Sequence, residues 1–175
     1  TSIGNSAFSY CRGLTTVTIP HSVTSIGEAA FSYCYGLRSA GLSNAIGSIK
    51  KKLFHRCLAL ISIDIPNSVT SIGDNAFSES GLISVVVPDA VTTIGKQVFA
   101  GCPDLRTVSI GTGLTSMGLY PFQYSNNLTT LNFNAINCQD LLSSMCANSL
   151  TTLNIGNDVQ TIPAYFCKGC SNLNT

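Results

Sequence analysis

The sequence of 175 residues contains no tryptophan, and charged residues make up only 10% of it, against roughly a quarter in an ordinary soluble domain. Nine lysines and arginines face eight aspartates and glutamates, so the net charge is +1 and no basic stripe is available for a phosphate backbone. No apolar run approaches the roughly 20 residues of a transmembrane helix. We therefore expect no nucleic-acid partner and no membrane insertion by this segment.

What the sequence does contain is a short phrase that recurs along the whole chain. The segment 69–77, Val-Thr-Ser-Ile-Gly-Asp-Asn-Ala-Phe, returns nearly unchanged at 23–31 and more loosely at 91–99. Its last position defines a series in steps of 21 to 23 residues: Phe8, Phe31, Phe54, Phe77, Phe99, Phe122, Met145 and Phe166. A second series with the same spacing is Leu14, Leu37, Leu60, Leu82, Leu105, Leu128, Leu150 and Leu173. A fixed period of this size indicates a solenoid.

Each unit contains the signals for one coil. Residues 16–19 alternate between hydroxyl and aliphatic side chains, as a half-buried strand does, and Pro20 ends the strand. Residues 23–26 fit a second short strand, and Gly27 permits a turn. The apolar residues of 30–34 are spaced as on one face of a short helical turn.

Neighbouring coils must stack, because one coil cannot bury its apolar side alone. We predict an α/β solenoid with residues 1–175 as a single array of about seven to eight coils. Ile3 already occupies a core position and Leu173 opens a strand. We therefore expect the chain to be an excerpt of a longer array without its caps.

The unit Leu-x-x-Val-x-Ile-Pro-x-x-Val-Thr-x-Ile-Gly-x-x-Ala-Phe-x-x-Cys resembles the BspA-like leucine-rich repeats. The resemblance covers essentially the whole chain, and it is most specific over residues 3–110 and weaker across 134–149. It implies a right-handed coil of about 23 residues per turn, with a parallel β-sheet on one face and short strands and helical turns on the other. It also implies a cell-surface or secreted protein with a role in adhesion, which binds a host, matrix or neighbouring-cell protein.

Reactive side chains do not converge in this arrangement. His21 follows Pro20 whereas His55 follows Phe54, so the two histidines occupy different positions of the repeat and therefore different faces. The carboxylates are scattered in the same way, and no set of nucleophile, base and orienting group is formed. We predict that the protein is not an enzyme and uses no cofactor.

The eight cysteines are open to several interpretations. Five of them lie at or next to one position of the repeat, which favours a column of buried thiols: Cys11, Cys34, Cys57, Cys102 and Cys170. Cys146 and Cys167 each follow the aromatic position in adjacent coils, so they are a possible disulfide pair, with Cys138 as a competing partner. Cys167-x-x-Cys170 has the spacing of zinc ligands but lacks a second pair, so we predict no metal site.

The candidate binding residues are the outward-facing side chains of the predicted sheet, which form two columns. The first column is Thr16, Ser39, Ser62, Ser84, Thr107, Thr130 and Thr152, and the second includes Thr18, Asp64, Val86, Ser109, Asn132 and Asn154. Hydroxyls in the first column also suit a strand for structural reasons alone, whereas the second column is as varied as a recognition surface. Both columns lack the aromatic residues and arginines that dominate binding hot spots. We therefore expect weak contacts that are multiplied along a longer array.

Three functions fit these observations. The leading hypothesis is a non-catalytic module that binds proteins through the sheet face. The alternatives are a carbohydrate-binding surface, which the hydroxyl columns suit although they offer no aromatic platform for a sugar ring, and a purely structural spacer or stalk.

Overall fold

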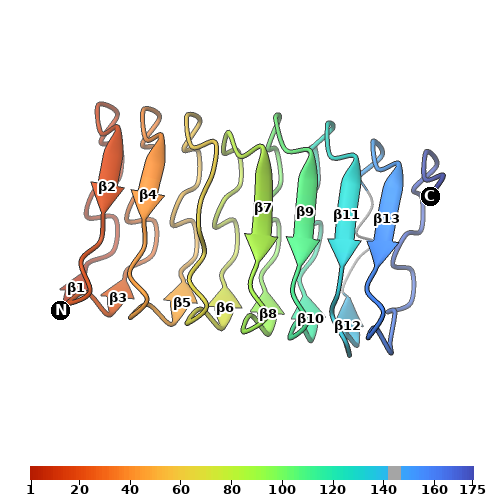
Figure 1. The fold of residues 1–175 in the computed structure, drawn as a ribbon. Coiled ribbons are helices and arrows are strands. Elements are labelled where there is room, and N and C mark those ends of the chain that lie inside the picture. The colour runs from red at the N-terminus through yellow and green to blue at the C-terminus, as the bar shows by residue number, and fades with distance from the viewer. Residues whose placement is uncertain (142–146) are drawn as a thin grey trace.

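The computed structural model describes residues 1–141 and 147–175, and they form a solenoid whose coils lie side by side (Figure 1). Parallel strands pair with a shift of about 23 residues, as Thr107 does with Thr130. The predicted solenoid with parallel strands is thus confirmed, whereas its right-handed winding, the number of coils and the missing caps stay predictions.

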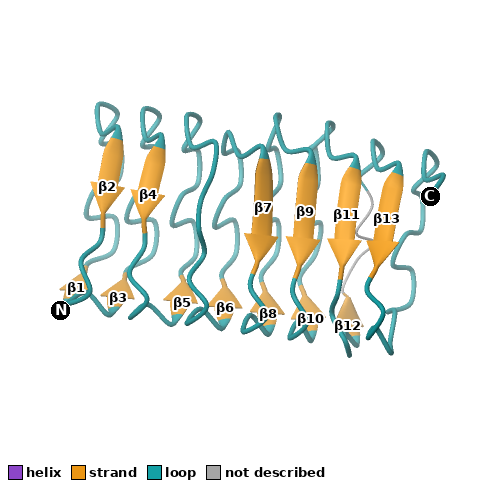
Figure 2. Ribbon diagram, viewed as in Figure 1, coloured by secondary structure: helices purple, strands orange, loops and turns teal. Residues whose placement is uncertain are grey.

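The longer strands form the front of the molecule as drawn in Figure 2, and we call their outward side the sheet face. They are β2 (Thr16–Thr18), β4 (Ser39–Gly41), β7 (Ser84–Val87), β9 (Thr107–Ile110), β11 (Thr130–Phe133) and β13 (Thr152–Ile155). β2 pairs with β4, and β7, β9, β11 and β13 form a separate sheet of four strands. In these strands the inward residues are aliphatic or aromatic and the outward ones mostly polar, as the alternation in the sequence predicts.

Short strands form the lower edge of the same picture (Figure 2). They are β1 (Ser2–Ile3), β3 (Ser25–Ile26), β5 (Ser48–Ile49), β6 (Ser71–Ile72), β8 (Thr93–Ile94), β10 (Ser116–Met117) and β12 (Asp140–Leu141). β1 pairs with β3, while β5, β6, β8, β10 and β12 follow one another in a second parallel sheet. Most coils therefore have a strand at two of their sides, as predicted, whereas residues 60–66 form none on the sheet face.

The predicted helical turns are wrong, since none of the residues that the structure describes is helical. The segments that follow the corner glycine are instead chains of tight turns, and their N–H groups alternate between two kinds of partner. Phe31 N–H donates to Leu53 C=O on the next coil at 3.1 Å, and Tyr33 N–H to His55 C=O at 2.8 Å, whereas the intervening N–H groups bond within their own coil. In a helix, every N–H would bond within its own coil. These segments are not helical because alternate N–H groups donate to the next coil instead.

Left-handed residues make this alternation possible. Two positions in most coils have a positive φ, namely two residues before and two after the phenylalanine, and most of them are not glycine. They include Ala29 (φ 53°), Tyr33 (φ 61°), Lys52 (φ 56°), Arg56 (φ 58°), Asn75 (φ 54°) and Glu79 (φ 54°). A left-handed residue ends a right-handed helix, so no helical turn can continue. We call the outward side of these segments the turn face.

The phenylalanines of the turn segments form an unbroken stack in the core. Neighbouring rings from Phe8 to Phe122 lie nearly parallel, with centroids 5.2–6.0 Å apart and interplanar angles of 2–12°. Phe31, Phe54, Phe77 and Phe99 are fully buried. The predicted alignment of these aromatic residues is confirmed.

The cysteine position beside this stack has a specific partner. The Cys57 thiol donates to Phe31 C=O at 3.2 Å, and in a later coil the Ser125 hydroxyl donates to Phe99 C=O at 2.7 Å. The same contact is made by Cys34 and Cys102, and Cys34, Cys57 and Cys102 are fully buried free thiols. The position thus needs a small side chain with a donor, which explains why cysteine and serine alternate there.

The disulfide expected between Cys146 and Cys167 is not formed. Cys167 is a half-buried free thiol, while Cys170 is disulfide-bonded. Cys146 lies outside the described residues, and Cys138, the competing partner, is a buried free thiol. The last coil has one additional residue in this segment, so the position next to the aromatic residue no longer indicates which cysteine is bonded.

The corner glycine is required by space rather than by its backbone angle. A Cβ placed on Gly95 would lie 2.6 Å from the backbone nitrogen of Asp74 on the preceding coil, and one on Gly27 would lie 2.5 Å from that of Asn5. Neighbouring coils therefore approach closely at this corner. Lys50 occupies the same position in the coil directly after that of Gly27, so one corner accommodates a side chain.

Candidate functional site

The structure places the predicted binding residues on the sheet face in two columns, in the expected register. Thr16 pairs with Ser39 at one end of the first column, and Ser84, Thr107, Thr130 and Thr152 follow one another further along it. The second column runs through Val86, Ser109, Asn132 and Asn154 in the same sheet, with Thr18 on β2. Ser62 and Asp64 are exposed in the coil between β4 and β7. The outward residues of β9 and β11 (Thr107, Ser109, Thr130 and Asn132) are only half-exposed.

Part of the second column is occupied by contacts within the column. The Asn154 amide donates to Asn132 Oδ1 at 2.7 Å, and the Asn132 amide donates to Ser109 Oγ at 2.8 Å. These side chains link three neighbouring strands on the surface. This end of the column is therefore partly structural.

The sheet is interrupted at one coil, which we call the seam (residues 60–66). Within the described part of the chain, the seam forms no strand and no backbone hydrogen bond joins it to β4. Ala40 and Gly41 of β4 favour strands weakly, which fits a weakened sheet here. Figure 1 shows the seam as a plain trace between the arrows of β4 and β7.

A hollow of about 320 Å³ opens on the sheet face at the seam. Its lining includes Ser62, Asp64, Ser84 and Val86, four of the predicted binding residues. Val86 is 66% exposed, although valine is one of the residue types most often buried. The structure thus brings these four together and leaves the others in the regular columns.

Beside the hollow lies an apolar rim that the sequence analysis missed. Ile61 and Ile83 are 54% and 44% exposed, and Ile83 N–H donates to Ile61 C=O on the neighbouring coil. Arg106 follows on the next coil, where its N–H donates to Ile83 C=O, and Arg38 holds the same position one coil before Ile61. The sequence does contain a signal for this rim. At the position directly after the repeated leucine, these coils carry isoleucine or arginine where other coils carry threonine.

The turn face holds a second cluster that the sequence analysis missed. The rings of Tyr10 and Tyr33 stack with centroids 4.4 Å apart, and the Arg56 guanidinium lies 5.5 Å from the Tyr33 centroid. Arg12 lies 5.4 Å from the centroid of Tyr35. Tyr10 and Tyr33 each lie two residues after a phenylalanine of the repeat, so an alignment of the units on that position would have found this pair.

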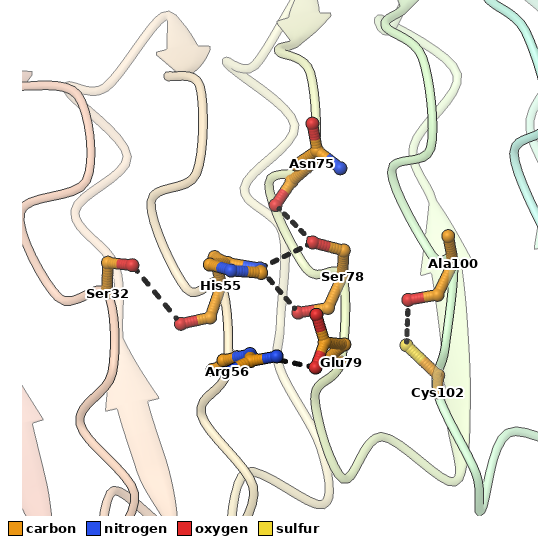
Figure 3. Close-up of polar contacts among 8 residues, drawn as sticks. All are labelled: Ser32, His55, Arg56, Asn75, Ser78, Glu79, Ala100 and Cys102. Atoms are coloured by element: carbon orange, nitrogen blue, oxygen red, sulfur yellow. Dashed lines mark hydrogen bonds and ion pairs between the residues drawn. The ribbon is translucent and has the colours of Figure 1, made fainter.

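One serine–histidine pair, Ser78 and His55, is close enough together to be considered as a catalytic pair (Figure 3). His55 Nδ1 lies 2.6 Å from Ser78 Oγ and 3.2 Å from Ser78 C=O. A proton on Nδ1 would satisfy both contacts, because a carbonyl oxygen only accepts and the serine hydroxyl in turn donates to Asn75 C=O at 3.2 Å. In this hydrogen-bonding arrangement Nδ1 is a donor and not the acceptor that a general base would need.

The surroundings of this pair are those of a structural contact. Burial lowers the pKa of His55, which favours its neutral form. The Glu79 carboxylate pairs with Arg56 at 2.8 Å and does not orient the histidine. No nucleophile, base and orienting carboxylate converge at this pair.

Two further features bear on the class of the protein. Within residues 1–141 and 147–175, no three His, Cys, Asp or Glu side chains lie close enough together to hold a metal ion. The described residues also include no helix of the length and apolar character that a membrane span requires.

The repeat matches a known family over nearly all of its length. The family model of the BspA type leucine rich repeat region matches residues 1–129 and 47–174, with six copies. The chain belongs to the BspA-type leucine-rich repeat family. The predicted resemblance is thus confirmed, and this family is one of repeat scaffolds.

Solved structures of bacterial leucine-rich repeat proteins share the fold. A protein from Bacteroides ovatus is 29% identical with a TM-score of 0.75 over 99% of this chain, and this BspA-type chain spans about half of its length (51%). The T. pallidum leucine-rich repeat protein is 28% identical with a TM-score of 0.74, and 97% of this chain and 72% of that one are covered.

A more distant structure comes from a leucine-rich cell surface protein of Faecalibacterium prausnitzii. It is 22% identical, with a TM-score of 0.63 over 99% of this chain and 56% of that one. It supports the fold alone. No curated protein matches the chain.

Proposed function

We propose that the chain is a non-catalytic protein-interaction module of a cell-surface or secreted protein, with a role in adhesion, and that it binds through the sheet face at the seam. The observation that carries this proposal is the exposure of Val86 beside the hollow, in a column that is otherwise polar. The neighbouring Ile61 and Ile83 enlarge the apolar area, and arginine is among the residues enriched in binding hot spots.

The partner that suits this surface is a protein of the host, the matrix or a neighbouring cell. Apolar side chains can cover Val86, Ile61 and Ile83, while carboxylates can meet Arg38 and Arg106 at the rim. The surface or secreted location is proposed from the chain's membership of the BspA-type repeat family.

A structural spacer is the second candidate, and the hydrogen-bonded series Asn154–Asn132–Ser109 favours it. In that case the columns would stabilise the stack and bind nothing. A carbohydrate site on the sheet face has less support, because the predicted columns contain no aromatic side chain.

Binding of the intact protein to a panel of immobilised extracellular-matrix proteins, followed by biolayer interferometry, tests the proposal. We expect Val86→Lys and Ile83→Lys, which each place a charge in the apolar area, to weaken binding at least about tenfold, the change expected when about 1.4 kcal/mol is lost. Leu119→Lys is the matched control, since Leu119 is also apolar and exposed but lies on the turn face. Binding that survives both sheet-face changes would refute this site.

A further inference from the structure

The turn face contains a gap in a column of outward side chains. The position two residues after the phenylalanine is left-handed in successive coils and carries a large side chain in most of them. The series is Tyr10, Tyr33, Arg56, Glu79, Gly101 and Tyr124, with φ between 54° and 68°. Gly101 leaves its coil without a side chain between Glu79 on one side and Tyr124 on the other.

This gap forms the floor of a hollow of about 530 Å³, which we call the notch. It is lined by Asn75, Ser78, Glu79, Gln97, Gly101 and Tyr124, among others. The volume lies within the range of small-molecule sites, which is roughly 300–1,000 Å³. Figure 3 draws three of these lining residues, Asn75, Ser78 and Glu79, with their hydrogen bonds and ion pair.

The charges of the notch exclude several classes of ligand. Glu79 is its one carboxylate, and Arg56 already pairs with that carboxylate at 2.8 Å. A free cation would have to compete with the guanidinium, and the lining provides no arginine or lysine for a phosphate. A neutral ligand therefore fits best.

The remaining groups combine one flat apolar surface with several hydrogen-bonding groups. Tyr124 is 73% exposed, so a face of its ring is open to a ligand. The electron-rich face of an aromatic ring attracts the positively polarised edge of C–H groups. Gln97 Nε2 donates to Gln123 Oε1 at 3.0 Å, which holds the amide in place at the wall. A ligand with an apolar face and many hydroxyls satisfies both requirements.

We propose that the notch binds one neutral sugar ring, which stacks on Tyr124 and forms hydrogen bonds to Glu79 and to the amides of Asn75 and Gln97. This site lies on the turn face and is independent of the protein-binding surface proposed at the seam. It supplies the aromatic platform that the sheet face lacks.

Saturation-transfer NMR of the intact protein with neutral monosaccharides tests this proposal, with glucose, galactose, mannose, fucose, N-acetylglucosamine and N-acetylgalactosamine as the probes. Gly101→Arg fills the notch with the residue that the same position carries at Arg56, and the added Cβ comes closest to the flexible Glu79 side chain, at 3.0 Å. Tyr124→Ala removes the ring from the surface. We expect each change to raise the dissociation constant of the bound sugar at least tenfold.

Tyr165→Ala is the matched control, since Tyr165 is 70% exposed and also left-handed (φ 62°), in another coil. It should leave sugar binding unchanged within about twofold, and so should Val86→Lys on the sheet face. Far-UV circular dichroism checks folding, and Tyr124→Ala keeps the test valid if Gly101→Arg does not fold. Binding of no sugar, binding unaffected by both notch variants, or binding of N-acetyl-lysine amide alone would each overturn the proposal.

Discussion

The two long faces of this solenoid connect neighbouring coils by different means. On the sheet face, extended strands pair in register and every second side chain points outward. On the turn face, only alternate N–H groups reach the next coil, and the left-handed residues, such as Ala29 and Tyr33, are among these donors. Both faces therefore join the coils, but the turn face also contributes the stacked phenylalanines.

The difference is clearest at the seam, where one face is interrupted and the other is not. Behind residues 60–66, Phe77 N–H still donates to Val98 C=O and Phe54 N–H to Ala76 C=O, and the rings of Phe54 and Phe77 remain stacked. The turn face thus stabilises the stack of coils, and the sheet face can vary without breaking it. This comparison predicts larger effects from changes on the turn side than from changes on the sheet side.

The largest effect is expected from the phenylalanine stack. Phe77→Ala removes a fully buried ring that stacks with Phe54 and Phe99, so we expect the free energy of unfolding to fall by about 3–5 kcal/mol. Val108→Ala, on the inner side of the sheet, removes two buried carbons and should cost about 2 kcal/mol. Urea denaturation of both variants measures the difference. An equal or larger loss for Val108→Ala would contradict the greater importance of the turn side.

The next effect concerns the corner glycine, where neighbouring coils approach closely. Gly95→Ala places a Cβ 2.6 Å from the backbone nitrogen of Asp74, and such overpacking should cost about 1–3 kcal/mol. Gly47→Ala is the control, because nothing lies within 4 Å of the Cβ that it would add. Thermal unfolding should show a lower Tm for Gly95→Ala alone. Similar values for the two variants would mean that the corner relaxes freely.

A smaller effect follows from the buried thiols of the turn segments. Burial raises the pKa of Cys57 from 9.0 to about 12. Above pH 9 the unfolded chain loses this proton and the folded chain keeps it, so stability falls as the pH rises from 9 towards 12. The expected loss at pH 10 is about 1.4 kcal/mol, which corresponds to one pKa unit.

Cys57→Ser provides the control for this pH dependence, because Ser125 shows that a hydroxyl can make the same contact with a carbonyl. The variant should unfold at the same urea concentration as the parent at pH 7 and at a higher one at pH 10. The exposed Cys11 should meanwhile react readily with iodoacetamide in the folded protein, while Cys57 should not. Rapid alkylation of Cys57 would show that its coil opens.

The period and the core positions were predictable because identical positions of successive coils must meet in a stack. The sequence therefore predicted the aromatic stack and both columns of the sheet face. The turn segments were not predictable in the same way. The spacing of Ala30, Phe31 and Cys34 fits either a helical turn or a series of tight turns, and the deciding hydrogen bonds connect to another coil. Positive φ at Ala29 or Tyr33 leaves no glycine as a signal.

The binding surfaces were predictable only in part, for a related reason. A column can be derived from the repeat, but a hollow results from one coil that departs from the pattern. At the seam the departure is the loss of pairing with β4, whose Ala40 and Gly41 favour strands weakly, and at the notch it is a single glycine at position 101. Both departures become visible only when each position is compared along all the coils.

The smallest effect is expected on the sheet face, from Asn132→Ala. This change removes the amide contacts with Ser109 and Asn154, but the Ser109 and Asn154 side chains can bond to water instead, so we expect a loss below about 1 kcal/mol. Leu131→Ala, in the same strand but fully buried, should cost several times more, about 2–5 kcal/mol. A loss for Asn132→Ala comparable to that for Leu131→Ala would show that the column holds the coils together. The sheet face would then be a structural element, and this result would favour the structural-spacer hypothesis over the protein-interaction hypothesis.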